Sequence, residues 1–179
     1  VDISFFRLKP HETILRPALW PHTDRQYFQQ EKYRLIFPFD DFTTPNDSVV
    51  REKTLVWEGM QQVKGNGSLF PAEAVNWPEG EYLVRISAVD NFGQPVTYEQ
   101  SFSLFKNDSR KMPAKELAWF HLSHQEAQPG DTILFYAGSA EKSNRVLLEI
   151  RSGNEIVYKK WHRISNSLKT IPFVVEEKH

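Results

Sequence analysis

The chain has 179 residues, of which 40% are apolar, and it carries 22 basic and 23 acidic side chains. At roughly 150 residues per domain, this is the composition of a folding protein with one to two domains. The net charge of −1 excludes the cation excess that a nucleic-acid or anionic-lipid partner requires. Because there is no cysteine, disulfides, thiolate metal sites and cysteine nucleophiles are excluded as well.

The first 65 residues are expected to hold short strands between long ordered loops. Alternating apolar residues predict three strands, at 3–8, 33–37 and 55–63. The ranges 10–31 and 38–52 contain five prolines and many polar groups, so we interpret both as loops. Val1 stands directly in a strand pattern, without an initiator methionine or a signal segment. We therefore expect the chain to be a fragment of a longer protein.

The clearest period of two lies between residues 82 and 104. Apolar residues alternate along 82–88 and again along 96–104, and Asp90 to Gly93 supplies turn chemistry between them. This pattern predicts a β-hairpin. Gln100 interrupts its apolar face, which indicates a sheet edge or an interdomain contact there. Residues 71–77 are expected to form at most one turn of helix.

The second half of the chain shows the same alternation of apolar residues, interrupted by turn motifs. Five strands are predicted, starting at Trp119 and covering 133–137, 146–150, 156–161 and 171–175. Pro129-Gly130 suits the centre of a type II turn, and 152–155 suits a hairpin turn. Since 133–137 is apolar on both sides, we expect both faces of that strand to be covered. With no helical stripe over ten or more positions, the chain is predicted to be all-β.

Apolar alternation stops between Lys106 and Lys115, where charged residues and proline take over. We therefore expect a first domain at 1–106, a linker at 107–115 and a second domain at 116–179. The second domain lacks a counterpart of the last strand and hairpin of the first. It is therefore expected to be incomplete, or to receive its last strands from elsewhere.

Residues 77–82, Trp-Pro-Glu-Gly-Glu-Tyr, form the most specific local motif. In immunoglobulin-like sandwiches a tyrosine near the start of a late strand bonds back to the backbone upstream, and a preceding glycine allows a sharp turn. We interpret Gly80 and Tyr82 as such a structural corner.

The five tryptophans raise the question of carbohydrate stacking. Four of them lie in strand-like runs or beside the corner, and we expect core or interdomain packing for Trp57, Trp77, Trp119 and Trp161. Trp20 lies in a proline-rich loop, where binding residues often lie. It is the one candidate binding residue, although packing on the adjacent sandwich is the favoured interpretation.

Metal and catalytic motifs are not expected. His121 and His124 are three apart near one strand, so their side chains should point to opposite faces. Asp40, Asp41 and Asp47 lack the spacing and glycine of a calcium loop. A nucleophile elbow is missing, and 65–68 is better interpreted as a hairpin turn than as a phosphate cradle. We predict no enzyme, cofactor or metal.

Several segments together resemble macroglobulin-like domains of bacterial alpha-2-macroglobulin-type proteins, above all the large forms of Bacteroidetes. The segments that carry the resemblance are 77–82, 87–93, 102–105, 128–132, 146–150 and 157–161. The first three resemble the end of one such domain and the last three the start of the next. Order and spacing carry this similarity over about 70–176.

This resemblance implies tandem immunoglobulin- or fibronectin-III-like antiparallel β-sandwiches in an extracytoplasmic protein, in the periplasm or at the cell surface, that traps proteases cutting a bait segment. Only scaffold positions transfer, namely Gly80, Tyr82, Asp90, Gly93, Pro129 and Gly130. The Cys-Gly-Glu-Gln thioester of many members is excluded here, because the chain has no cysteine. No bait segment is recognised either.

We therefore expect a non-catalytic scaffold segment of an endopeptidase inhibitor. Its expected partners are neighbouring macroglobulin-like domains of the same parent chain and, through the full-length protein, proteases. Nucleic acid and direct membrane insertion are not expected. One alternative is a carbohydrate-binding or adhesin module of a surface protein, with Trp20 as its platform. Another is an accessory sandwich domain of a large hydrolase.

Overall fold

A computed structural model describes residues 1–14, 16, 27–40, 42, 51–62 and 70–177. Half of the described chain is β-strand and 8% is helix, and the strands pair antiparallel, which confirms the prediction of a mostly β protein. The chain divides into two compact units. The first comprises Val1–Pro10 and Val49–Lys106, and the second His11–Ser48 and Asn107–His179. The second unit thus takes in the early residues that sequence patterns placed in the first domain.

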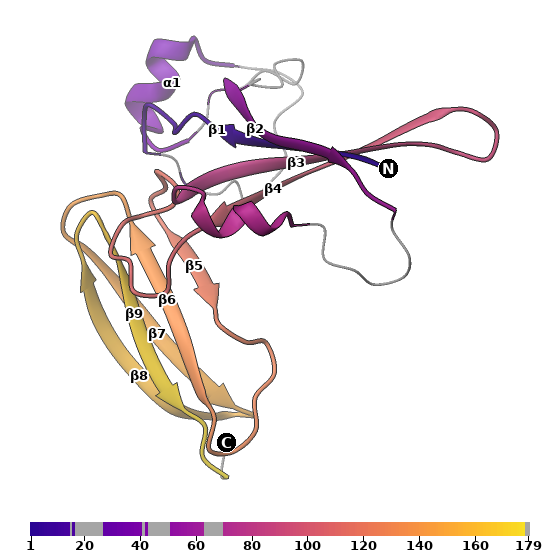
Figure 1. The fold of residues 1–179 in the computed structure, drawn as a ribbon. Coiled ribbons are helices and arrows are strands. Elements are labelled where there is room, and N and C mark those ends of the chain that lie inside the picture. The colour runs from indigo at the N-terminus through magenta and orange to yellow at the C-terminus, as the bar shows by residue number, and fades with distance from the viewer. Residues whose placement is uncertain (15, 17–26, 41, 43–50, 63–69, 178–179) are drawn as a thin grey trace. The chain divides into compact units, whose positions relative to one another are not determined.

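The first unit is built on one four-stranded sheet with the order β2-β1-β3-β4 (Figure 1). Its strands are β1 (Asp2–Leu8), β2 (Lys53–Met60), β3 (Gly80–Val89) and β4 (Pro95–Leu104). β3 and β4 form the predicted hairpin, and β4 is an edge strand of this sheet, as Gln100 indicated. A single 3₁₀ turn, η1 (Ala72–Asn76), lies where one turn of helix was expected.

An aromatic cluster covers one face of this sheet. Phe5 is 1% exposed, and its ring lies 5.2–6.1 Å from the rings of Trp57, Phe70, Trp77 and Phe102. These spacings are those of edge-to-face and offset aromatic pairs, which add to the free energy gained by burial. Trp57 and Trp77 therefore pack on the sheet, as predicted.

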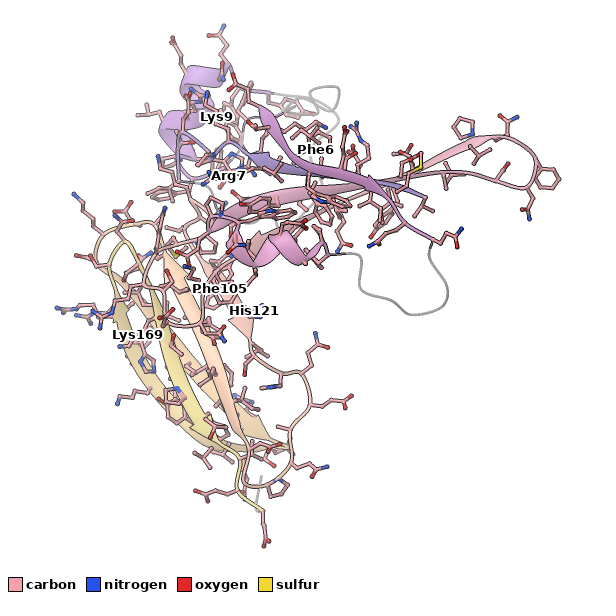
Figure 2. The ribbon with its side chains drawn as sticks, viewed as in Figure 1. Phe6, Arg7, Lys9, Phe105, His121 and Lys169 are labelled. Atoms are coloured by element: carbon pink, nitrogen blue, oxygen red, sulfur yellow. The ribbon has the colours of Figure 1, made fainter. Side chains whose placement is uncertain are left out.

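The opposite face of the sheet carries charge around Phe6 (Figure 2). The Nζ atom of Lys53 lies 4.8 Å from the Phe6 ring centroid, and the guanidinium carbon of Arg85 lies 5.3 Å from it. Arg85 also forms an ion pair of 2.6 Å with Glu99 on β4. One apolar and one charged face explain the alternation seen in the sequence.

The second unit contains the five predicted strands in two sheets (Figure 1). They are β5 (Trp119–Leu122), β6 (Thr132–Ser139), β7 (Asn144–Ser152), β8 (Glu155–Ile164) and β9 (Ser167–Val174). The sheets have the orders β5-β6-β9 and β7-β8. The consecutive residues Tyr136 and Ala137 of β6 are 2% and 4% exposed, which confirms that both faces of this strand are covered.

Residues 107–115, expected as a linker, lie against the sheet β5-β6-β9. The Leu168 backbone N–H donates to the Arg110 carbonyl at 2.8 Å, and Ala114 is buried. A Cβ atom added to Gly138 on β6 would meet the Met112 side chain. This segment therefore covers the face of the sheet on which Tyr136 is buried.

The strand predicted at 33–37 is wrong, because α1 (Gln30–Ile36) occupies this segment. Tyr33 and Phe37 are four residues apart, a spacing that fits both the period of a strand and one turn of a helix. The Phe37 N–H donates to the Tyr33 carbonyl at 2.7 Å, and the two rings lie 5.0 Å apart. The helix therefore places both rings on one face.

Candidate functional site

The corner motif in the first unit is a structural element. The Tyr82 hydroxyl donates a hydrogen bond of 2.6 Å to the carbonyl of Pro78, four residues back, and its ring stacks on Trp77 at 5.5 Å. Burial raises the pKa of Tyr82, and the charge of Arg7 opposes this effect. The hydroxyl is thus held neutral and engaged, which suits fixing the chain rather than binding or catalysis.

The other sequence-predicted scaffold positions form turns. Gly93 and Gly130 have φ values of +78° and +98°, which favour glycine. A carboxylate oxygen of Asp90 accepts two backbone N–H bonds of 2.8 Å within the hairpin loop. The turn centred on Pro129 and Gly130 is closed by a hydrogen bond of 3.0 Å. None of these residues meets another to form a reactive centre.

The tryptophans differ in their surroundings. Trp20, the candidate carbohydrate platform, lies outside the described residues, while Trp119 is buried on β5. Of the two alternatives expected for Trp161, packing in the core of its own unit is wrong, since this residue on β8 is 63% exposed, and interdomain packing stays a prediction. The exposed aromatic surface of the second unit therefore includes Trp161.

Metal-binding geometry is absent from the described part of the chain, where no three His, Asp or Glu side chains gather. The His121 ring packs 6.0 Å from that of Tyr136, and the His124 Nδ1 atom lies 2.9 Å from the Ser123 hydroxyl. Asp40 accepts a hydrogen bond of 2.8 Å from Arg16. Asp41, Asp47 and the predicted turn at 65–68 lie outside the described residues.

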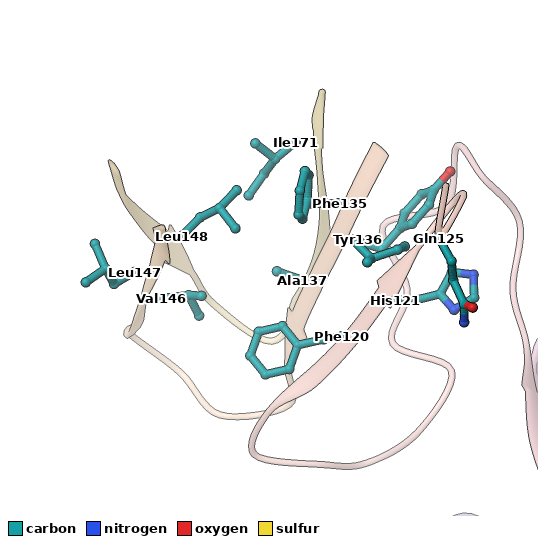
Figure 3. A pocket seen from close by; sticks show the side chains of 11 residues that line it. Phe120, His121, Gln125, Phe135, Tyr136, Ala137, Val146, Leu147, Leu148 and Ile171 are labelled. Carbon is teal, nitrogen blue, oxygen red and sulfur yellow. The ribbon is translucent and has the colours of Figure 1, made fainter. Parts of the chain in front are cut away.

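An apolar groove with a volume of about 340 Å³ lies between the two sheets of the second unit (Figure 3). Side chains from the two sheets face the same space, and we name as groove residues Phe120, Leu122, Phe135, Ala137, Val146, Leu148 and Ile171. In Figure 3, Phe120 points toward Val146 across the groove, whereas His121 and Gln125 lie on the far side of β5. His121 and Tyr136 are the titratable residues of its lining, and the remaining lining residues apart from Gln125 are apolar.

The groove lies where each sheet ends in an edge strand. β7 pairs with β8 alone and β5 with β6 alone among the described strands, so one edge of each faces no partner there. The groove residues Ala137 and Ile171 form a buried core cluster with Ile164. At the groove, Phe120 and Leu122 remain 63% and 42% exposed. Burying apolar surface lowers the free energy by about 25 cal/mol per Å². Covering Phe120 and Leu122 with a partner would therefore be favourable.

The arrangement suits the binding of an extended apolar chain. A strand that pairs with an open edge satisfies its backbone groups there and places every second side chain on one face. Sequence reasoning missed the groove because its residues come from four separate strands. One sequence feature did point to an open site: the second domain lacks a counterpart of the last strand and hairpin of the first domain.

Family models, curated proteins and solved structures give no match to the chain. Neither helix in the described part of the chain has the length and apolar character needed to cross a membrane. The role of the groove is therefore inferred from its own geometry.

Proposed function

We propose that the chain is a non-catalytic scaffold segment of a protease-trapping protein of the alpha-2-macroglobulin type. In this proposal its second unit is an immunoglobulin-like sandwich that accepts one β-strand from a neighbouring domain of the same parent protein. The observation that carries the proposal is the apolar groove beside the open edge of β7.

The occupant is a strand because this place offers both unpaired backbone groups and apolar side chains. The open edge of β7 presents backbone donors and acceptors over a strand of nine residues. The groove beside it presents apolar side chains from both sheets. An extended segment with alternating apolar residues can pair with the backbone of β7 and also cover the groove. A helix would cover the groove but could not pair with the backbone of β7.

The scaffold role rests on the same features. The corner at Tyr82 and the pairing of a three-stranded with a two-stranded sheet support sandwich modules joined in series. Modules that share a strand across a boundary move together. They would thereby relay the cleavage of a bait segment as a domain rearrangement in the periplasm or at the cell surface. Exposed Trp161 favours a second candidate function, carbohydrate binding.

Strand acceptance is tested with a fluorescent peptide of alternating threonine and valine, flanked by lysines for solubility. We expect saturable binding and slower amide exchange along β7. The same peptide with two central residues replaced by proline cannot pair with the edge, and we expect it not to bind.

The variant Phe120→Asp places a charge in the groove at an exposed position and should weaken peptide binding at least about tenfold, because the charge would be buried by the peptide. Ile156→Asp on β8 is the matched control, since Ile156 is also exposed but does not line the groove. Equal binding by wild type and Phe120→Asp would refute strand acceptance. Separately, stoichiometric inhibition of trypsin by this chain alone would refute the scaffold role.

A further inference from the structure

Two arginines face each other on the outer side of the β7–β8 hairpin. Arg145 on β7 is directly opposite Arg163 on β8. Trp161 precedes Arg163 by two residues, so its side chain is on the same side of the strand. Together with His162, these residues line a hollow of about 270 Å³. Like charges directly opposite each other destabilise a sheet, so this arrangement has a cost.

Three other charged side chains of this hairpin, Glu149, Arg151 and Lys159, form ion pairs with one another. Glu149 accepts hydrogen bonds from Arg151 at 2.7 Å and from Lys159 at 2.9 Å. These bonds lower the pKa of Glu149, with the hydrogen bond from Lys159 as the largest cause and that from Arg151 as the second. Within the described residues, by contrast, Arg145 and Arg163 make no ion pair with a carboxylate. Both residues are exposed, so their guanidinium groups are open to an anion from outside the unit.

The positive surface continues beyond the arginine pair. Arg163 also lines a second hollow, of about 440 Å³, together with Arg110 and Lys169, and Asp108 is its one acidic lining residue (Figure 2 labels Lys169 on β9). His162, a buried residue of β8 between Trp161 and Arg163, has a lowered pKa. Burial is the largest cause, and the nearby charges of Lys169 and Lys160 lower the pKa further. Two adjoining hollows thus share one cationic side chain and a positive potential.

Trp161 adds an apolar surface beside the charges. Its indole is 63% exposed and is paired across the hairpin with Leu147, which is 37% exposed. A flat, exposed indole packs against the C–H face of a pyranose ring. Successive residues on one face of a strand are about 6.6 Å apart, so an acidic group at Arg163 and a ring at Trp161 fit one sugar unit and its neighbour.

We propose that the outer face of β7 and β8 binds an acidic polysaccharide, with a carboxylate or sulfate held between Arg145 and Arg163 and an adjacent sugar ring packed on Trp161. Guanidinium pairs suit these anions because each presents a planar fork of donors. This site is separate from the groove and does not depend on strand acceptance.

Single-stranded nucleic acid is the less suitable polyanion for this surface. Its binding proteins combine a long positive groove with several stacked aromatic side chains. Here one tryptophan is flanked by a few cations, and the whole chain has a net charge of −1. An acidic glycan needs only one stacking platform and widely spaced anionic groups.

The test titrates the whole chain by calorimetry at constant salt with four probes: a heparin hexasaccharide, tetragalacturonate, the neutral cellohexaose and an oligothymidylate of matched length. We expect at least one acidic oligosaccharide to bind, and the hexasaccharide and tetragalacturonate distinguish sulfate from carboxylate recognition. Cellohexaose should not bind measurably. Binding of neither acidic glycan, or tighter binding of the oligothymidylate, would overturn the proposal.

The variants Arg145→Ala and Arg163→Ala should each weaken glycan binding by about tenfold, the effect of losing one charge-assisted contact. Trp161→Ala should weaken glycan binding by a similar factor but leave competition by inorganic sulfate unchanged. Arg151→Ala is the matched control, because it removes the same charge from the same hairpin at a residue already paired with Glu149. Equal losses in Arg151→Ala and Arg163→Ala would show only a net-charge effect and overturn the site. All four positions are on an exposed face, and circular dichroism verifies folding.

Discussion

Arg51 and Glu81 form a bidentate ion pair in the first unit, with Nη1 to Oε1 at 2.9 Å and Nη2 to Oε2 at 2.8 Å. Both side chains are less than one-fifth exposed, at 17% and 15%. Arg51 also donates to the carbonyl of Lys9 through Nε at 3.1 Å and Nη2 at 2.6 Å. One guanidinium thus joins the start of β3 to the backbone just after β1.

Replacing Arg51 by lysine keeps the charge but removes the fork of donors. We expect Arg51→Lys to lower the free energy of unfolding by about 1–3 kcal/mol, the range for lost hydrogen bonds to charged groups. Urea denaturation measures the change. The control is Lys9→Ala, which removes an exposed ion pair with Glu52 and should cost less than about 1 kcal/mol. Equal costs for the two variants would contradict the role of the fork.

The corner hydrogen bond predicts a small, specific loss in Tyr82→Phe. The substitution removes the hydroxyl that bonds the Pro78 carbonyl but keeps the buried ring. We expect a loss of about 0.5–1.5 kcal/mol in the free energy of unfolding. Tyr98→Phe also removes one hydroxyl bond, to Gln100, but at an exposed position, and should be nearly neutral. The interpretation fails if thermal denaturation shows no difference between the two variants.

His162 predicts a loss of stability in mild acid. Its pKa is lowered by burial and by Lys169 and Lys160, so the unfolded chain takes up a proton at higher pH than the folded chain. Stability is therefore complete above the unfolded value of about 6.5 and falls as the pH decreases toward the folded pKa. In His162→Asn the slope of the unfolding free energy between about pH 5 and 6.5 should be smaller. An unchanged slope would exclude His162 as its source.

Close packing at Gly138 predicts a coupled pair of mutations. A Cβ atom in Gly138→Ala would meet the Met112 side chain and would lie 3.2 Å from Leu168 Cδ1. Overpacking of this kind costs about 1–3 kcal/mol. In a Met112→Ala background the same substitution should cost less, which a double-mutant cycle of urea unfolding free energies measures. Additive costs would show that Met112 is not what the new methyl group meets.

The hairpins at 82–104 and 146–161, the turns at Gly93 and Gly130 and the mostly β character were predictable from the amino-acid sequence alone. These features are local: alternation reports the faces of a strand, and positive φ values favour glycine whatever surrounds them. Gly93 and Gly130 could therefore be assigned to turns directly. The segment at Tyr33 to Phe37 could not, because a spacing of four residues fits a strand and a helix alike.

The buried face of each strand, and the residues that come into contact, depend on how the strands and sheets pack together. Alternation places the side chains of Trp161 and His162 on different faces of β8. The pairing with β7 and the packing of the two sheets decide that the histidine is buried and the indole is exposed. Likewise, Phe120 and Val146 share a groove because two sheets come together. Such contacts join residues far apart in sequence, and their free energy depends on the whole packed unit rather than on any local pattern.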